Sequence, residues 1–296
     1  MKYTVKAAAM ATGVSESRLR TWERRYGIPR PTRSATGRRL YDEHDLAIIR
    51  RMAALAAAGV SAAEAAAAAR SEEAAPPAAP VAAPSEEHPL ISELLEASLA
   101  YDEPGITRGI REAVGTAWEK ALEEVLFPVL YRLGEHWGEG VVSCATEHFT
   151  TEVIRRELAA ALAAAPDPLP DAPSALLACP EEERHELGLL AMALLLSQRG
   201  LRVFYLGGDV PAPDLVFAIG KTNPDAVCLA ATTASGLASL GRTVRSLVSV
   251  RAPVRLFVGG PAFGRGYGED SIPGARLPHS LGAAADAMSN TLSTRS

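Results

Sequence analysis

Apolar residues in the last third of the chain fall into short runs that alternate with stretches of helical period. The predicted strands are residues 174–179, 201–207, 225–230 and 254–260, and the predicted helices are residues 186–200, 212–222 and 238–248. Strands and helices that alternate at this spacing predict a doubly wound parallel α/β sheet over residues 174–293. Such sheets bind ligands beyond the carboxyl ends of their strands. The loops expected to carry a ligand therefore follow Cys179, Leu206, Ala230 and Val258.

The middle of the chain has a different pattern, with apolar residues three and four positions apart. This period predicts a four-helix bundle over residues 89–166. Residues 71–88 are rich in Ala, Pro and Glu and have no apolar period, so they predict a semi-extended linker. A second proline-rich break, residues 166–174, separates the bundle from the sheet. The chain is therefore expected to be multidomain.

Residues 1–70 have the pattern of a helix, a turn and a second helix, followed by a hairpin and a further helix. Small residues mark the turns, and the second helix carries its apolar residues on one face. The defining positions are the turn at Gly13, the N-cap Ser15, the buried Leu19 and Trp22, the hairpin turn at residues 36–37, and the last helix from Asp42 to Gly59.

Composition adds a charge asymmetry to this organisation. Residues 1–70 contain 13 Lys and Arg against 6 Asp and Glu, whereas the whole chain of 296 residues has a net charge of -5. A basic head on an acidic body indicates a polyanionic partner for the head alone. No apolar stretch reaches the roughly 18–20 residues of a membrane span, and the N-terminus lacks a signal-peptide core, so a cytoplasmic protein is expected. Three cysteines without metal spacing argue against a disulfide scaffold or a zinc site.

The head contains the run RLRTWERRYGIPRPTRSATGRRLYDEHDL over residues 18–46. This run resembles the DNA-binding domain of the MerR family of transcriptional regulators, over residues 2–70. The resemblance implies an all-α winged helix-turn-helix head, an oligomer, and double-stranded operator DNA as the partner. The residues that it assigns to DNA are Arg18, Arg20, Thr21, Tyr26, Arg38, Arg39 and Tyr41. The alternative is a solvated basic face on a structural helical domain.

The segment ERHELG at residues 183–188 directly follows the first predicted strand of the sheet. His185 lies there at a strand's carboxyl end, where an imidazole can ligate a metal. Glu183 can accept the other ring N–H, which would fix the tautomer and raise the basicity of the ligand. Gly188 lets the backbone approach a bulky ligand closely. The alternative is an ordinary surface histidine.

This segment resembles the cobalamin-binding signature, acid-x-His-x-x-Gly, of corrinoid-dependent enzymes and sensors. The resemblance implies that His185 is the axial cobalt ligand and that the freed nucleotide tail of the cofactor enters the sheet domain. Gly259 and Gly260 match the glycine pair beside that tail. The family usually has Ser-x-Leu after the third strand, where this chain offers Thr232 or Thr233 for the hydroxyl.

A second pattern lies in the predicted bundle, where Trp137 is followed ten residues later by Glu147 and then by His148. Trp-x9-Glu-His resembles the helical cap of the light-responsive CarH/LitR group of MerR-type regulators. The resemblance implies that Trp137 covers the upper corrin face and that Glu147 and His148 contact a 5′-deoxyadenosyl upper ligand, with Cys144 on the same stretch. The alternative for Trp137 is a bundle-core tryptophan.

Together these features predict a light-responsive transcriptional repressor that is not an enzyme. Adenosylcobalamin is the expected cofactor, and it is expected to build an oligomer, a dimer or tetramer, that binds operator DNA and releases it when light breaks the Co–C bond. Light-responsive members have a histidine directly after the tryptophan that corresponds to Trp137, whereas this chain has Gly138 there. The sequence therefore does not identify the residue that would become the upper cobalt ligand after photolysis. The alternatives are a MerR-type regulator that no longer uses cobalamin, a light-independent cobalamin sensor, and a corrinoid methyltransferase module.

Overall fold

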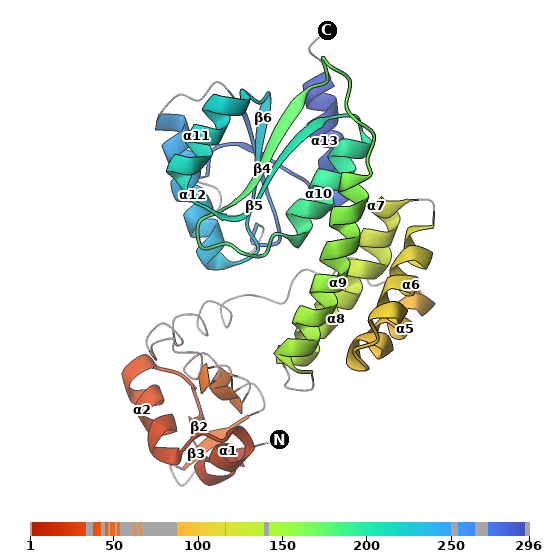
Figure 1. The fold of residues 1–296 in the computed structure, drawn as a ribbon. Helices are drawn as coiled ribbons and strands as arrows, with labels where there is room; N and C mark the ends of the chain where they lie inside the picture. The colour runs from red at the N-terminus through yellow and green to blue at the C-terminus, as the bar shows by residue number, and fades with distance from the viewer. Residues whose placement is uncertain are drawn as a thin grey trace. The chain divides into compact units, whose positions relative to one another are not determined.

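The computed structural model describes residues 2–33, 38–42, 45–46, 48–50, 52–53, 62, 66, 88–115, 117–138, 142–249, 254–263 and 272–293 (Figure 1). The chain forms two compact units, one of residues 1–83 with 132–144 and the other of residues 84–131 with 145–296. Within the described ranges, no helix is long and apolar enough to cross a membrane.

The head is built from two helices and a small antiparallel sheet. Its elements are β1 (Tyr3–Thr4), α1 (Val5–Thr12), α2 (Glu16–Tyr26), β2 (Thr32–Arg33) and β3 (Arg39–Tyr41), with the strands in the order β1-β3-β2. Gly13 adopts a φ of 70° between the helices, and the Ser15 hydroxyl accepts a hydrogen bond from the Arg18 amide at 3.3 Å. The predicted turn, N-cap and hairpin strands are therefore confirmed. The predicted hairpin turn at 36–37 and the helix end at Gly59 lie outside the described residues.

One strand of the head was not predicted. The pattern places residues 3 and 4 in the first helix, but β1 pairs there with β3 and turns the hairpin into a three-stranded sheet. Thr4 instead caps α1, because its hydroxyl accepts a hydrogen bond from the Ala7 amide. Leu19 and Trp22 of α2 are buried as predicted, in one cluster with Tyr41 of β3. This cluster fixes the wing against α2.

The bundle residues form the expected helices. They are α5 (Pro89–Leu99), α6 (Glu103–Val114), α7 (Trp118–Ala121), η1 (Leu122–Leu126), α8 (Phe127–Gly138) and α9 (Cys144–Ala163). The η1 segment is a π-helical turn, so α7, η1 and α8 follow one another without an intervening loop. Asp102 caps α6 by accepting a hydrogen bond from the Gly105 amide at 3.0 Å.

The C-terminal domain confirms the predicted doubly wound sheet. Its elements are β4 (Ser174–Pro180), α10 (Leu187–Gln198), β5 (Arg202–Val210), α11 (Ala212–Thr222), β6 (Ala226–Ala230), α12 (Ala234–Ser249), β7 (Arg255–Gly259), β8 (Ala275–Arg276) and α13 (Leu281–Ser293). The strand order is β5-β4-β6-β7-β8, and every pairing is parallel. The order reverses between β4 and β6, which is where such sheets place their ligand crevice.

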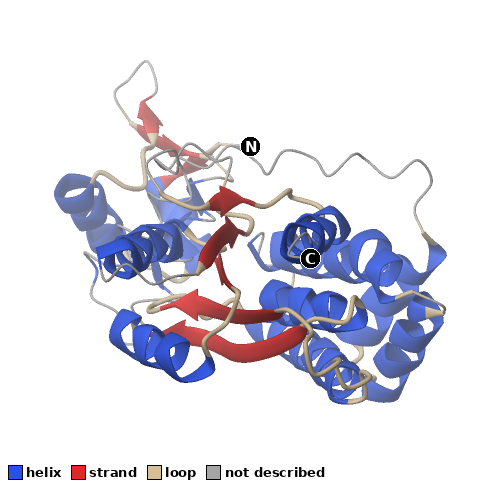
Figure 2. Ribbon diagram, turned by 90° about the horizontal axis from the view of Figure 1, so that it is seen from above, coloured by secondary structure: helices blue, strands red, loops and turns tan. Residues whose placement is uncertain are grey.

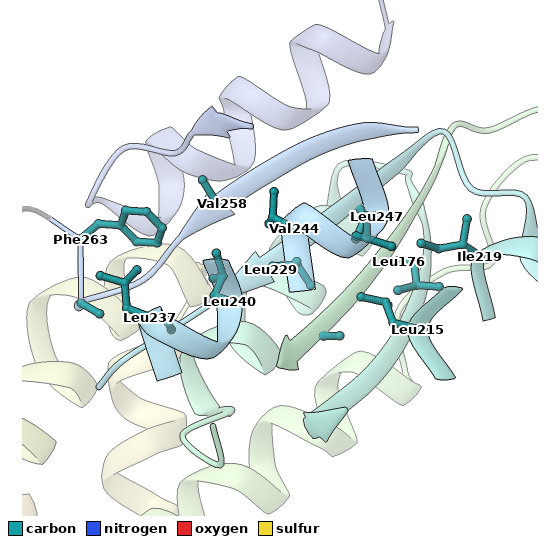
Figure 3. Packing of buried hydrophobic residues seen from close by; sticks show 14 residues of the cluster. Leu176, Leu215, Ile219, Leu229, Leu237, Leu240, Val244, Leu247, Val258 and Phe263 are labelled. Carbon is teal, nitrogen blue, oxygen red and sulfur yellow. The ribbon is translucent and has the colours of Figure 1, made fainter. Parts of the chain in front are cut away.

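Helices cover both faces of this sheet, as Figure 2 shows. Figure 3 shows the core on one face of the sheet, where α11 and α12 pack on the strands. Strand residues such as Leu176 and Val258 meet helix residues such as Leu215 and Leu240, and all four are fully buried. The continuous apolar runs of the sequence are explained by this burial on both faces.

Polar contacts attach the bundle to the sheet domain at one end. Arg199, at the end of α10, donates hydrogen bonds at 2.8 Å to Glu119 of α7 and to Asp286 of α13. The Glu123 carboxylate of η1 accepts hydrogen bonds from the Ser280 hydroxyl at 2.8 Å and from the Gly282 amide at 3.0 Å, at the start of α13. The bundle is therefore held against α10 and α13.

Candidate functional site

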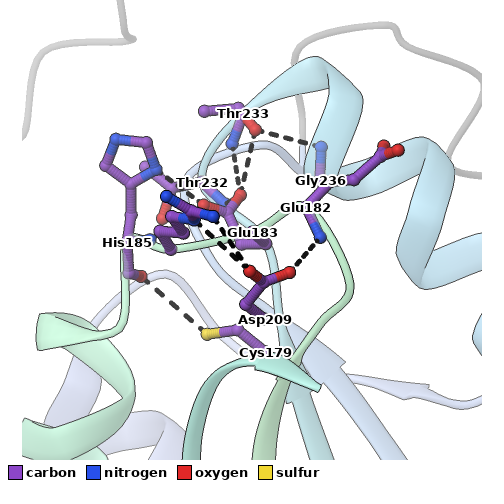
Figure 4. A network of polar contacts seen from close by, with 9 residues as sticks. Cys179, Glu182, Glu183, His185, Asp209, Thr232, Thr233 and Gly236 are labelled. Carbon is purple, nitrogen blue, oxygen red and sulfur yellow. Dashed lines mark hydrogen bonds and ion pairs between the residues drawn. The ribbon is translucent and has the colours of Figure 1, made fainter. Parts of the chain in front are cut away.

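A buried carboxylate organises the carboxyl edge of the sheet (Figure 4). Glu183, in the loop after β4, has a side chain with no exposed surface. One of its oxygens accepts hydrogen bonds from the Nδ1 atom of His185 at 2.6 Å and from the His185 amide at 3.0 Å. The other accepts from the Thr232 amide at 2.8 Å and from the amide and hydroxyl of Thr233, both at 3.0 Å. The carboxylate thus joins the loops after β4 and β6 across the switch point.

These hydrogen bonds keep Glu183 ionised. Burial alone would raise the pKa of Glu183, but the hydrogen bonds from His185, Thr233 and Thr232 outweigh it and lower the pKa to about 2. An ionised carboxylate can only accept, so Nδ1 of His185 must carry the proton. The hydrogen bond that His185 donates to Glu183 also raises the pKa of His185 above its ordinary value, against the opposing effect of burial. Glu183 therefore sets the tautomer, which was the predicted arrangement.

His185 presents its ring at the surface of this edge. The side chain is 63% exposed, and with Nδ1 engaged, Nε2 is the nitrogen that offers a lone pair. The loop that carries it is fixed on its other side by β5, because the Asp209 amide donates to the Glu183 carbonyl at 2.9 Å and the Glu182 amide donates to the Asp209 carboxylate at 2.9 Å. A fixed ring with a directed lone pair is what a metal ligand requires.

Glycines shape the surroundings of His185. Gly188 is the second residue of α10. An added Cβ there would meet no atom within 4 Å, so the described chain leaves open space beside this glycine. At Gly260, with a φ of 107°, a Cβ would lie 2.3 Å from the Ala231 carbonyl oxygen, and at Gly259 it would lie 3.3 Å from Leu277. Gly260 is thus required by a close approach to the backbone of the protein itself, whereas Gly259 has only a tight contact with the Leu277 side chain.

Two threonines follow β6, and the structure distinguishes them. The Thr233 hydroxyl donates to Glu183 and accepts from the Gly236 amide at 3.0 Å, which also caps α12. Thr232 contributes its amide to Glu183. Thr233 is therefore the hydroxyl that supports the histidine, whereas the predicted contact of Thr232 with a nucleotide tail stays a prediction. An added Cβ at Gly236 would lie 2.1 Å from the Glu183 carboxylate, so any larger residue there would displace that carboxylate.

The first turns of α9 carry the bundle residues of the predicted site. Nδ1 of His148 lies 2.7 Å from the Glu147 carboxylate, which also accepts from the Thr151 hydroxyl at 2.9 Å. After the hydrogen bond to Glu183, the charge of the Glu147 carboxylate also contributes to the raised pKa of His185. Trp137 and Gly138 end α8, and Cys144 begins α9. The side chains of Trp137 and Cys144 lie outside the described part of the structure.

One group of residues at this edge was not predicted. The Glu186 carboxylate accepts a hydrogen bond from the Gly208 amide at 2.8 Å. Burial and the neighbouring Glu186 carboxylate raise the pKa of Tyr205, and both side chains act electrostatically on Arg155 of α9. The signal in the sequence was the Gly207-Gly208 pair within β5, because an added Cβ at Gly207 would lie 2.7 Å from Glu186.

The residues predicted to contact DNA lie on α2 and β3. Arg18 and Arg20 are exposed, with Arg18 5.4 Å from the Trp22 ring and Arg20 paired with Glu16 at 2.9 Å. The Thr21 hydroxyl donates to the Ser17 carbonyl at 2.9 Å. Tyr26 is half-buried, and Arg38 is exposed beside the wing. These positions leave the arginines of α2 on the surface of the second helix.

Two wing residues have structural partners instead. Arg39 is paired with Glu23 of α2, and this hydrogen bond raises the pKa of the Arg39 guanidinium. Tyr41 was also predicted to meet DNA; its side chain has no exposed surface, and its contact with DNA stays a prediction. Residues alternate between the two faces of a strand, and the Tyr41 face of β3 is the one that packs on α2.

Replacing Tyr41 with Phe is therefore expected to keep or raise the unfolding temperature of the protein. The change removes a buried hydroxyl that has no hydrogen-bond partner among the described residues. DNA affinity, measured by fluorescence anisotropy at fixed salt, should stay within about twofold of wild type. Arg18→Ala is the matched comparison and should weaken DNA binding by about 1–3 kcal/mol. A comparable loss in Tyr41→Phe would contradict the burial of this ring.

The donor set at the sheet edge fits a metal-centred cofactor with a broad planar ring. A single imidazole nitrogen is directed outward, its other nitrogen is held by an ionised acid, and open space lies beside Gly188. One protein ligand of this kind suits a cobalt ion whose other ligands come from a macrocycle. Cobalamin is such a group.

Comparison with known proteins agrees with this geometry. Residues 3–72 match the family described as MerR HTH family regulatory protein, and residues 90–162 and 173–274 each match a B12 binding domain. HTH-type transcriptional repressor CarH of Myxococcus xanthus is 35% identical over 235 residues, which cover 77% of this chain and 78% of that protein. HTH-type transcriptional repressor CarA of the same organism is 33% identical over 268 residues, which cover 88% and 87%.

A solved structure shows the same fold in the C-terminal part. The monomethylamine corrinoid protein of Methanosarcina barkeri covers 68% of this chain and 98% of its own, with a TM-score of 0.55 at 17% identity. A winged helix-turn-helix joined to a helical bundle and to this parallel sheet defines a class, the cobalamin-binding transcriptional regulators. The chain belongs to the MerR family, in its cobalamin-binding, CarH-type branch.

Proposed function

We propose that this protein is a cobalamin-dependent transcriptional repressor, and not an enzyme, that binds operator DNA as an oligomer when it holds adenosylcobalamin and releases the DNA on illumination. One observation carries the proposal. The imidazole of His185 is exposed at the switch point of the sheet while a buried, ionised Glu183 fixes its tautomer. The names of CarH and CarA, both transcriptional repressors, support the regulatory part.

Different residues of the chain would contact different parts of the cofactor. His185 would hold cobalt through Nε2, with Glu183 and Thr233 keeping the ring in place. Glu147 and His148, on the first turns of α9, would contact the upper ligand from the bundle side. The bound cofactor would supply a Co–C bond that light can break.

The basic head would supply the DNA contacts. Arginines exposed on α2 suit the phosphates and base edges of a major groove. A single head of this size binds DNA weakly, whereas several heads on one assembly bind far more tightly because the later contacts are intramolecular. Loss of the upper ligand would loosen the α9 contacts and with them the assembly.

The test is a DNA-binding measurement in darkness and in light. Purified protein is mixed with adenosylcobalamin in the dark, and its affinity for operator DNA and its molecular mass are measured before and after green light. The proposal expects a larger mass and tighter DNA binding in the dark, and loss of both on illumination. Equal DNA affinity in dark and light would remove the light-response claim, and equal affinity with and without cobalamin would remove cofactor dependence.

Gly188→Ala separates ligand contact from folding. In the cofactor-free protein the added methyl meets no atom within 4 Å and suits the α10 helix, so stability should be unchanged or higher by up to about 1 kcal/mol. If a corrin lies against α10 here, the same methyl should weaken cobalamin binding by about tenfold. Gly220→Ala, in α11 with equally open space, is the control and should leave cobalamin binding unchanged. Unaltered affinity in Gly188→Ala would argue against contact at this position.

A further inference from the structure

The turn between α5 and α6 places a tyrosine where helices usually have glycine. Tyr101 adopts a φ of 53°, in the left-handed region. Its amide donates to the Ser98 carbonyl at 3.1 Å, and the Asp102 amide donates to the Ala97 carbonyl at 2.9 Å, which is the Schellman arrangement at a helix end. Glycine fits this position without strain, whereas a residue with a Cβ does not. The tyrosine side chain must therefore contribute something that offsets its backbone conformation.

The Tyr101 side chain reaches the first two turns of α9. Its hydroxyl lies 3.0 Å from the Thr146 hydroxyl, and its ring lies 5.1 Å from the Phe149 ring at an interplanar angle of 42°. Thr146 is 4% exposed, and its carbonyl accepts a hydrogen bond from the buried Thr150 hydroxyl at 3.0 Å. The contact therefore continues into the interior of the bundle.

The residues that Tyr101 touches flank Glu147 and His148 in the sequence. Each residue of an α-helix is turned by about 100° from the one before it. The direction midway between Thr146 and Phe149 is therefore opposite to the direction midway between Glu147 and His148. Tyr101 thus contacts one face of α9, and the opposite face of the same turn carries Glu147 and His148, the two residues proposed to contact the upper ligand. The first turn of a helix lacks intrahelical partners for its amides and frays easily, so a contact there matters for position.

We propose that Tyr101 is a positioning residue that sets the preference for the upper axial group of cobalamin by holding the first turns of α9. The assignment rests on the proposed function, because it requires Glu147 and His148 to contact that group. Tyr101 itself touches no part of the ligand in this account and acts through Thr146 and Phe149.

The test compares two cobalamins that differ only in the upper group. The dark affinities of the full chain for adenosylcobalamin and methylcobalamin are measured by absorbance titration, and their ratio is taken. Tyr101→Phe loses the hydrogen bond to Thr146 and should lower the preference for the adenosyl form by about threefold. Tyr101→Gly suits the backbone of the turn and removes the whole side chain, so it should lower the preference by about tenfold with methylcobalamin binding kept. Tyr131→Phe, at a tyrosine of similar exposure on α8, should change nothing.

A second measurement needs no cofactor. Amide hydrogen exchange at residues 146–150 should be several-fold faster in Tyr101→Gly than in wild type, and unchanged in Tyr131→Phe. Wild-type exchange and a wild-type adenosyl preference in both Tyr101 variants would overturn the assignment alone. If the wild-type chain binds neither cobalamin, the proposed function fails and this assignment fails with it. Tyr101→Phe keeps the ring contact with Phe149. If Tyr101→Gly does not fold, the adenosyl preference of Tyr101→Phe alone tests the assignment.

Discussion

His185→Ala is expected to remove cobalt ligation by the protein while leaving the fold intact. The affinity for cobalamin should fall by roughly 100-fold or more, because a lost metal ligand costs more than the 10–100-fold typical of a lost outer partner. The absorbance spectrum of any residual complex should become that of cobalamin with its own base on cobalt. Stability should change by less than about 1 kcal/mol, because the ring is 63% exposed and the residue 185 amide, Thr232 and Thr233 still bind Glu183.

His279→Ala is the control for this change, since His279 is an exposed histidine outside the Glu183 network. It should bind cobalamin as wild type does. If His185→Ala and wild type show the same affinity and the same spectrum, His185 is a surface histidine and the regulator does not bind cobalt through it. If wild type and His185→Ala both elute colourless from a desalting column after incubation with cobalamin, the alternative of a MerR-type regulator that no longer uses cobalamin is favoured.

Glu183→Gln is expected to damage both the fold and the site. Both carboxylate oxygens of Glu183 accept hydrogen bonds from backbone amides, so whichever way a glutamine is turned, its NH2 group faces other donors. The free energy of unfolding should fall by about 2–4 kcal/mol. Cobalamin affinity should fall by about 10–100-fold, because the imidazole loses its fixed tautomer. Glu182→Gln, at the exposed neighbouring residue, should cost less than about 0.5 kcal/mol.

The pH dependence of stability identifies the same carboxylate. The pKa of Glu183 is lowered from 4.5 to about 2 in the folded protein, so the unfolded chain takes up the proton first as the pH falls. The contribution of Glu183 is therefore fully present above about pH 4.5 and is lost as the pH falls toward 2, in total on the order of 3 kcal/mol. The difference in unfolding free energy between wild type and Glu183→Gln should shrink over this range. A constant difference would mean that Glu183 is not ionised in the native state.

The sequence predicted the sheet and the core of the site because their signals are local. The central strands β4 and β6 are buried along almost their whole length and read as continuous apolar runs. Glu183 and His185 are two residues apart in one loop, so their contact requires no knowledge of the fold. The helix pattern of the bundle, the turn at Gly13 and the N-cap Ser15 of α2 are local in the same sense.

The remaining parts depend on contacts between distant segments. Thr233 supports Glu183 from 50 residues away, and the strand order that brings β6 beside β4 decides this. The same holds for Glu186 and Gly208 across β4 and β5. Strand β8 has two residues, too few for a period, and β1 exists only because β3 pairs with it.

Burial also decides what a residue type does. Tyr41 belongs to a wing motif and was assigned to DNA, but its face of β3 packs on the helices. Tyr101 was not singled out, because a tyrosine in a turn has no signal until the left-handed φ and the contact with α9 are known. Residue type therefore predicted the kind of chemistry, and packing decided which residues take part.

The most direct test of cobalt ligation is the electron paramagnetic resonance spectrum of the cob(II)alamin complex of protein labelled with ¹⁵N-histidine. An axial nitrogen splits each cobalt line, into a triplet for ¹⁴N and into a doublet for ¹⁵N. If Nε2 of His185 holds cobalt, the labelled protein shows doublets. Triplets in the labelled protein would mean that the base of the cofactor stays on the metal and that His185 does not ligate cobalt.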